Sequence, residues 1–113
     1  YKAPLPIPTV LDGTSGGTIT ITSSKQCQQI FHNTWGGACG SPTEVWAYNG
    51  EFPGPTVVAK KGVPLDIRHV NNLGQDYEDN DISITTHHHG LHIVPASDGH
   101  PQPDYVTDSS FAI

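Results

Sequence analysis

The sequence lacks methionine, long apolar runs and an excess of basic residues, and these shortages narrow the classes of protein that it can represent. No apolar stretch approaches the roughly 18 residues that a membrane-spanning helix needs. Only 5 lysines and arginines stand against 11 acidic residues, which gives a formal net charge of −6. This balance argues against nucleic acid or an anionic membrane surface as the main partner. Because no signal peptide is visible at Tyr1, we expect that the true start has been removed or that the chain is a processed piece.

Cysteine is also scarce, because Cys27 and Cys39 are the only two in 113 residues. Their spacing, in a stretch rich in glycine, serine and threonine, does not fit a zinc ribbon. We predict a disulfide between them, with two free thiols or metal ligation as the alternatives. Disulfides persist in oxidising compartments, so we predict a secreted or extracytoplasmic protein.

No apolar pattern of helical period runs longer than a turn, and 12 glycines and 10 prolines interrupt the chain at short intervals. The clearest regular segment is 18–22, where threonine and isoleucine alternate as in a β-strand. Further strands are predicted over 44–48, 56–60, 64–71 and 82–89. Five or six short strands separated by turns predict an all-β protein, built as an antiparallel sandwich or barrel.

The two ends of the chain carry no clear strand signal. Prolines at positions 4, 6 and 8 exclude a helix or a central strand, so residues 1–17 are predicted to form an extended N-terminal arm and a turn. Residues 18–113 are predicted to form the domain itself. No regular element is predicted after position 90.

The seven histidines outnumber the lysines and arginines, and three of them, His87, His88 and His89, are consecutive. In a strand, His87 and His89 lie on one side and His88 on the other. Two imidazoles in this arrangement suit one metal or two adjacent metals, and imidazole binds copper, zinc, nickel and iron alike. The alternative is a solvated polar strand end. The histidines without paired spacing are expected to be surface or hydrogen-bonded residues: His32, His69, His92 and His100.

Segment 46–56 resembles the Tyr-Asn-Gly-x-x-Pro-Gly-Pro-Thr motif in the first domain of multicopper oxidases. Further matches follow in the family's order. They are the turn and strand end at 61–62 and 70–73, the His-x-His-Gly motif at 87–90 and the Asp-Gly-x-Pro segment within 97–101. The proline-rich arm at 4–8 is similar to the start of bacterial spore-coat laccases and their bilirubin-oxidase-like relatives. Together the matches cover most of the chain.

The resemblance implies a cupredoxin-like Greek-key β-sandwich. In this interpretation residues 18–113 form most of the first cupredoxin domain, which is incomplete without the rest of the enzyme. Complete members of the family oxidise small reductants at a type 1 copper and reduce dioxygen to water at a trinuclear cluster. Four His-x-His pairs ligate that cluster. The resemblance implies that His87 ligates the type 2 copper and His89 a type 3 copper, whereas His88 is the variable position of the motif.

Asp98 matches an acidic residue that the spore-coat laccases are thought to use in supplying protons to the cluster. Reduction of dioxygen to two waters consumes four protons, and a carboxylate is a reasonable proton relay. The alternative is that Asp98 is simply a turn residue ahead of Gly99.

The family's other ligands are missing from this sequence. A second His-x-His pair does not follow the Asp-Gly-x-Pro segment, and no Cys-His pair with a downstream methionine could build a type 1 site. We therefore predict that the chain is the N-terminal part of a laccase-like oxidase and that it is inactive alone. The predicted location is extracytoplasmic, with the spore coat as one possibility. Its expected partners are the remaining cupredoxin domains, from the same precursor or a second chain, dioxygen and a small reductant.

Two other classes of function stay open. One is a small stand-alone copper-binding protein that uses His87 and His89, with His92 or His100 as a further ligand. The other is a cupredoxin-like interaction domain whose histidines are vestigial.

Overall fold

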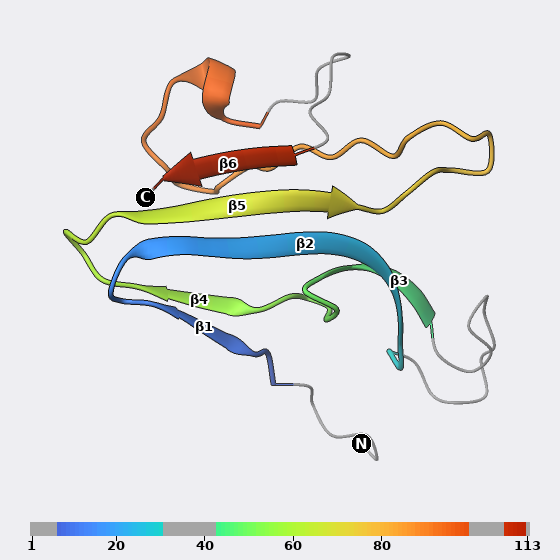
Figure 1. Cartoon of the computed structure of the whole chain (residues 1–113), viewed down its shortest axis with the longest axis horizontal. Helices are drawn as coiled ribbons and strands as arrows, with labels where there is room; N and C mark the ends of the chain where they lie inside the picture. The colour runs from blue at the N-terminus through green and yellow to red at the C-terminus, as the bar shows by residue number, and fades with distance from the viewer. Residues whose placement is uncertain (1–6, 31–42, 100–107, 113) are drawn as a thin grey trace.

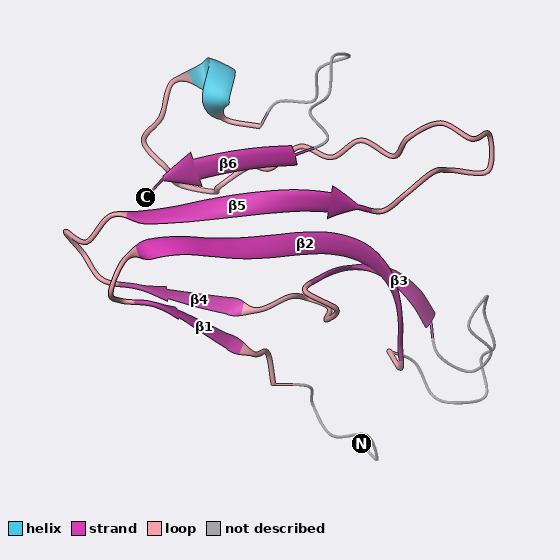
Figure 2. Cartoon of the chain, in the orientation of Figure 1, coloured by secondary structure: helices cyan, strands magenta, loops and turns pink. Residues whose placement is uncertain are grey.

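The computed structural model describes residues 7–30, 43–99 and 108–112. The described elements are strands apart from one short 3-10 helix, which confirms the predicted all-β class (Figures 1 and 2). In chain order they are β1 (Val10–Gly13), β2 (Gly17–Gln28), β3 (Thr43–Tyr48), β4 (Thr56–Ala59), β5 (Leu65–Asn72), η1 (Pro95–Ser97) and β6 (Asp108–Ala112). Within these ranges, no helix is long and apolar enough to cross a membrane.

The strands form two sheets, a four-stranded sheet in the order β3-β2-β5-β6 and a two-stranded sheet of β1 and β4 (Figure 1). β2 pairs with β3, and β5 with β6, in antiparallel fashion, but β2–β5 and β1–β4 are parallel. The prediction of an antiparallel sandwich or barrel is therefore confirmed for the pairs β2–β3 and β5–β6 and wrong for β2–β5 and β1–β4. The chain changes sheet between β1 and β2, between β3 and β4 and between β4 and β5, so the strands of the parallel pairs β1–β4 and β2–β5 are not neighbours in sequence.

The core lies between the two sheets and is small. Leu65 and Ile67 of β5, which are 0% and 3% exposed, pack with Ile21 of β2. Leu11 of β1 and Val57 of β4 cover this cluster from the second sheet. The buried residues of β5 alternate with exposed ones, as the period of two in a half-buried strand requires.

Four of the predicted strands are confirmed, as parts of β2, β3, β4 and β5. The predicted strand over 82–89 is wrong, because this segment has no regular secondary structure and is drawn as loop in Figure 2. The strand before it, β5, is paired on both sides by β2 and β6, so the segment cannot pair with β5 as the next strand of a hairpin. η1 and β6, after position 90, and β1, within the predicted arm, had not been expected as regular elements.

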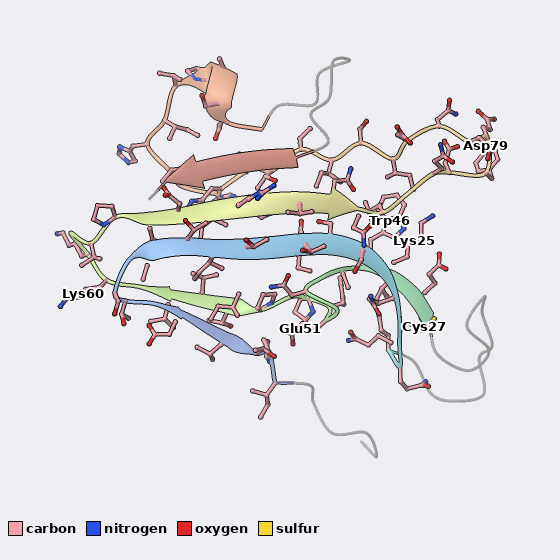
Figure 3. All side chains as sticks on the ribbon, in the orientation of Figure 1. Lys25, Cys27, Trp46, Glu51, Lys60 and Asp79 are labelled. Carbon is pink, nitrogen blue, oxygen red and sulfur yellow. The ribbon has the colours of Figure 1, made fainter. Side chains whose placement is uncertain are left out.

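Several predictions concern residues outside the described ranges, namely Cys39, His32 and His100. Cys27, by contrast, lies on β2 opposite Glu44 of β3 (Figure 3). The pairing of Cys27 with Cys39 therefore stays a prediction. The division of the chain into an arm over 1–17 and a domain over 18–113 also stays a prediction.

Candidate metal centre

The motif at 46–56 begins with a tight hairpin turn that follows β3. The amide of Tyr48 donates to the carbonyl of Glu51 (3.1 Å), and the amide of Glu51 donates back to Tyr48 (3.2 Å). The two residues between them, Asn49 and Gly50, have φ angles of 51° and 82°. Positive φ at both central positions is the mark of a type I′ turn, for which Asn-Gly is the preferred pair.

The side chain of Asn49 fastens this turn to β2. Its Oδ1 accepts from the amide of Thr22 (2.7 Å), and its Nδ2 donates to the carbonyl of Thr20 (3.3 Å). A second amide side chain holds the residue after the turn: Gln28 donates to the carbonyl of Phe52 (2.7 Å) and accepts from its amide (2.9 Å). The motif is thus held in place along the length of β2.

The segment that leads to the histidines, 82–86, is extended but joins neither sheet. Every second residue, namely Ile82, Ile84 and Thr86, is half-buried, and the residues between them are exposed. The segment starts from a fixed point at the end of β5. There Asn71 Nδ2 donates to the carbonyl of Ile82 (2.6 Å), and the amide of Ile82 donates to the carbonyl of Gly74 (3.0 Å).

A second tight turn follows at the histidines. The amide of Leu91 donates to the carbonyl of His88 (3.2 Å), which places His89 and Gly90 at the centre of the turn. Gly90 has a φ of 83°, and a positive φ at this position is what a type II turn requires of its third residue. Gly90 therefore ends the extended segment directly after the His-x-His motif.

The rings of His87 and His89 lie next to each other, with centroids 5.9 Å apart and planes at 77°. This is the pairing that alternation along an extended segment predicts. His88 does not stand wholly apart from the pair, because it lines the same cavity as His87. Whether His87 and His89 ligate a metal and His88 does not stays a prediction.

Asp98, the predicted proton relay, contacts His87. The Nδ1 atom of His87 lies 2.7 Å from the backbone carbonyl oxygen of Asp98 and 3.1 Å from its Oδ1. A carbonyl oxygen can only accept, so the short bond requires the proton to be on Nδ1. The Nε2 atom then keeps its lone pair, which is the form in which a neutral imidazole binds a metal.

A cavity of about 310 Å³ brings the two motifs together. The side of the cavity formed by the first motif carries Tyr48 and the run Pro53-Gly54-Pro55, and the histidine segment contributes Thr86, His87 and His88. Ile21 of β2 and His69 of β5 complete the lining. Segments almost 40 positions apart in the sequence thus meet at one place.

The structure corrects the expectation for His69, which the sequence analysis took for a surface or hydrogen-bonded histidine, because His69 lies buried in the lining of this cavity. Its side chain is 7% exposed, and its ring meets that of Tyr48 edge-on with centroids 6.2 Å apart. Burial lowers the pKa of His69 below its usual value, because the charged imidazolium loses its hydration. The sequence pattern of β5 could have predicted this burial, because the alternation that buries Leu65 and Ile67 also places residue 69 on the buried side.

The donor set fits a copper ion as a pair of ligands. Imidazole nitrogen is a good ligand for copper, and the ring of His87 is oriented by a partner on its other nitrogen, as metal-binding histidines usually are. Within residues 7–30, 43–99 and 108–112, no group of three or more histidine, cysteine or acidic side chains is arranged to hold a metal. His92 lines a separate open hollow with Leu91 and Ser97.

Comparison with known proteins agrees with the family resemblance of the motifs. The profile of the multicopper oxidase family matches residues 29–109. A laccase of Haloferax volcanii is 30% identical over 127 aligned residues, which cover 88% of this chain and 21% of that protein. A laccase of Bacillus subtilis is 29% identical over 59% of this chain and 16% of its own length. The cell division protein FtsP of Proteus mirabilis is 34% identical over 63% of this chain and 14% of its own length.

These findings place the molecule in a class and then in a family. The described elements are strands apart from the short η1, and together with the family match they make the chain a cupredoxin-like all-β domain. The chain belongs to the multicopper oxidase family, whose profile covers most of it. It spans about a fifth of the length of the Haloferax laccase and less of the others.

Proposed function

We propose that this chain is the N-terminal part of a laccase-like multicopper oxidase and that it supplies His87 and His89 to a trinuclear copper cluster. The observation that carries the proposal is the pair of adjacent imidazoles, one of which has its Nδ1 atom engaged by Asp98. Membership of the family and the likeness to two laccases support it. In this assignment His87 binds the type 2 copper and His89 a type 3 copper.

Copper held by these residues and by others would pass electrons from a small reductant to dioxygen, which is reduced to water. His87 presents Nε2 to the metal because Nδ1 is occupied by the Asp98 carbonyl. The carboxylate of Asp98 lies beside the same ring and is 32% exposed, so it can exchange protons with solvent and hold one near the site. The reaction consumes four protons, and we assign their delivery to Asp98.

The remaining cupredoxin domains of the same oxidase, from the same precursor or a second chain, are the proposed partners. Three aromatic side chains support this, because Trp46, Tyr48 and Phe52 are 57%, 44% and 47% exposed. They border a hollow of about 280 Å³ whose floor includes Ala47 and Leu73. Figure 3 shows Trp46 beside Lys25, its partner across the β2–β3 ladder. Clustered exposed aromatic groups are typical of surfaces that another domain covers.

The proposal is tested by metal analysis of three variants of the full-length protein, His87→Ala, His89→Ala and His88→Ala. We expect His87→Ala to lose mainly type 2 copper, seen by electron paramagnetic resonance, and His89→Ala to damage the type 3 pair. His88→Ala is the matched control and is expected to keep copper near the wild-type content. Full copper occupancy in both His87→Ala and His89→Ala, or loss of copper only in His88→Ala, would overturn the assignment.

Two other functions make different predictions. The likeness to a cell division protein favours, as a second candidate, an interaction domain whose histidines are vestigial, and such a domain would hold no copper in any of these variants. A small stand-alone copper-binding protein would show an intact native mass of 12.1 kDa. A laccase-like oxidase would show a much larger mass, because the chain spans 21% of the Haloferax laccase.

We also propose a secreted or extracytoplasmic location, with Cys27 and Cys39 joined in a disulfide. Closing a loop of this length would stabilise the fold by roughly 3 kcal/mol in the chain-entropy account. Thiol labelling of the denatured, unreduced protein is expected to find no reactive cysteine at either position. Labelling of both thiols would remove the main support for this location.

A further inference from the structure

The turn that carries Asp98 approaches the histidine segment closer than any side chain would permit. A Cβ atom on Gly99 would lie against the carbonyl oxygen of Thr86, 2.5 Å from the carbonyl carbon of Thr86 and 2.8 Å from the amide nitrogen of His87. Gly99 also has a φ of 73°, a conformation that L residues rarely adopt. Two independent features of the backbone therefore require glycine at this position.

The same turn is fastened from two other directions. The hydroxyl of Thr85 donates to the carbonyl of Gly99 (2.9 Å), which ties the turn to the residue two positions before His87. The amide of Asp98 donates to the carbonyl of Pro95 (3.1 Å), which continues the hydrogen bonding of η1. The carbonyl of Asp98 is left pointing at Nδ1 of His87 at 2.7 Å.

We propose that Thr85 and Gly99 are positioning residues that form a clamp, and that the clamp selects the nitrogen with which His87 binds copper. Gly99 lets the turn come close enough for the Asp98 carbonyl to accept from Nδ1, and the Thr85 hydroxyl holds it there. The tautomer is thus set by the backbone carbonyl at 2.7 Å, while the Asp98 carboxylate, whose Oδ1 lies 3.1 Å from the same nitrogen, takes the proton-transfer role. The inference deepens the proposed function, since it assumes that His87 is a ligand.

The clamp is tested with Gly99→Ala and Thr85→Val in the full-length protein, and Thr85→Ser is the matched control that keeps the hydroxyl. The first readout is the nitrogen-15 spectrum of the His87 imidazole in copper-free, histidine-labelled protein. We expect a fixed Nδ1–H tautomer in the wild type and in Thr85→Ser. We expect exchange between tautomers in Gly99→Ala and Thr85→Val.

The second readout is the copper affinity of the type 2 site. Loss of an orienting partner typically lowers metal affinity 10- to 100-fold, so we expect a loss of this size in Gly99→Ala and a loss of about 10-fold in Thr85→Val. Thr85→Val introduces no clash, so it decides the question if Gly99→Ala does not fold. An unchanged tautomer and affinity in Thr85→Val, or an equal loss in Thr85→Ser, would overturn the clamp.

The two readouts separate this inference from the function on which it rests. The tautomer is measured without copper, so it reports on the clamp alone. If His87→Ala keeps its copper while the tautomer of the wild type is fixed as described, the copper assignment fails and the hydrogen-bonded clamp stands. If His87→Ala loses copper while Thr85→Val matches the wild type in both readouts, the assignment stands and the clamp fails.

Discussion

At the scale of single residues, the contact between His87 and Asp98 separates two roles that one side chain could have combined. The carbonyl of Asp98 engages Nδ1 at 2.7 Å, and its Oδ1 lies at 3.1 Å. The backbone carbonyl therefore orients the ring, and it stays in place when a substitution at position 98 removes the carboxylate. Chemistry and positioning at this site can be altered independently.

Asp98→Asn is expected to keep the copper and to slow dioxygen reduction by about 10²-fold, the lower range for removal of a general acid or base. The carbonyl that holds His87 is unchanged in this variant, but the amide cannot carry the protons. Oxygen consumption and copper content are measured on the same full-length preparation. Oxygen consumption equal to that of the wild type would show that the carboxylate serves only the turn.

His69 is expected to titrate below its usual pKa of 6.5, because burial disfavours the imidazolium. The unfolded chain then binds a proton more readily than the folded one. The free energy of unfolding should therefore be unaffected by His69 above pH 6.5 and fall as the pH drops below that value, until the folded protein is protonated as well.

A pH titration of copper-free protein, in which the ring proton resonances of His69 are followed by NMR, gives the pKa of His69 as its midpoint. His69→Phe, which cannot titrate, is the control and should lose this part of the acid sensitivity. A midpoint at or above 6.5 would mean that burial does not control this histidine.

At the scale of elements, the side chain of Asn49 helps to hold the hairpin turn after β3 against β2, beside the hydrogen bond from its own backbone amide to the carbonyl of Thr22 (2.8 Å). We expect Asn49→Ala to weaken this attachment, because the variant loses the acceptor for the Thr22 amide and places alanine at a φ of 51°. The lost hydrogen bond is solvent-exposed, so we expect a loss of about 0.5–1.5 kcal/mol, which lowers hydrogen-exchange protection at Thr22 by roughly 2- to 12-fold. Asn49→Asp keeps the Oδ1 acceptor and is expected to protect Thr22 better than Asn49→Ala. Equal protection in all three proteins would contradict this account.

How much of the fold follows from the sequence is seen best in two strands. Alternation of apolar and polar residues predicts β2 and β5, because each buries one face and exposes the other. The same alternation is present over 82–86, yet that segment joins neither sheet, and the preceding strand β5 has no free edge with which it could pair. Local periodicity reports which side of a segment is buried, and it does not report which partner buries it.

The candidate site, too, follows from the sequence only in part. The spacing of His87 and His89 predicts their adjacency, which the structure shows. The contribution of His69 depends on the approach of β5 to the hairpin turn, and the closeness of Gly99 to Thr86 depends on the turn after η1. Both are contacts between segments far apart in the chain, which pattern reading along one segment does not reveal.

At the scale of the whole molecule, the chain offers the proposed pair of metal ligands, His87 and His89, but not the full set that a laccase-like oxidase needs. It contains no methionine and no Cys-His pair, so it cannot build a type 1 copper site of the family's usual kind. We expect the copper-loaded 113-residue chain alone to show no intense blue colour and no turnover of a phenolic substrate. The full-length protein is the positive control. Turnover by the 113-residue chain alone would refute the proposal that the remaining domains supply the type 1 copper site.

The central claim is that His87 and His89 hold copper through the nitrogens that the structure leaves available. Anomalous diffraction at the copper edge, from crystals of the full-length copper-loaded protein, tests it most directly. The account predicts one copper peak bonded to Nε2 of His87 and a second, separate copper bonded to His89. Copper bound instead through His88 or His92, or no anomalous peak beside His87 in a protein that is loaded with copper, would contradict it.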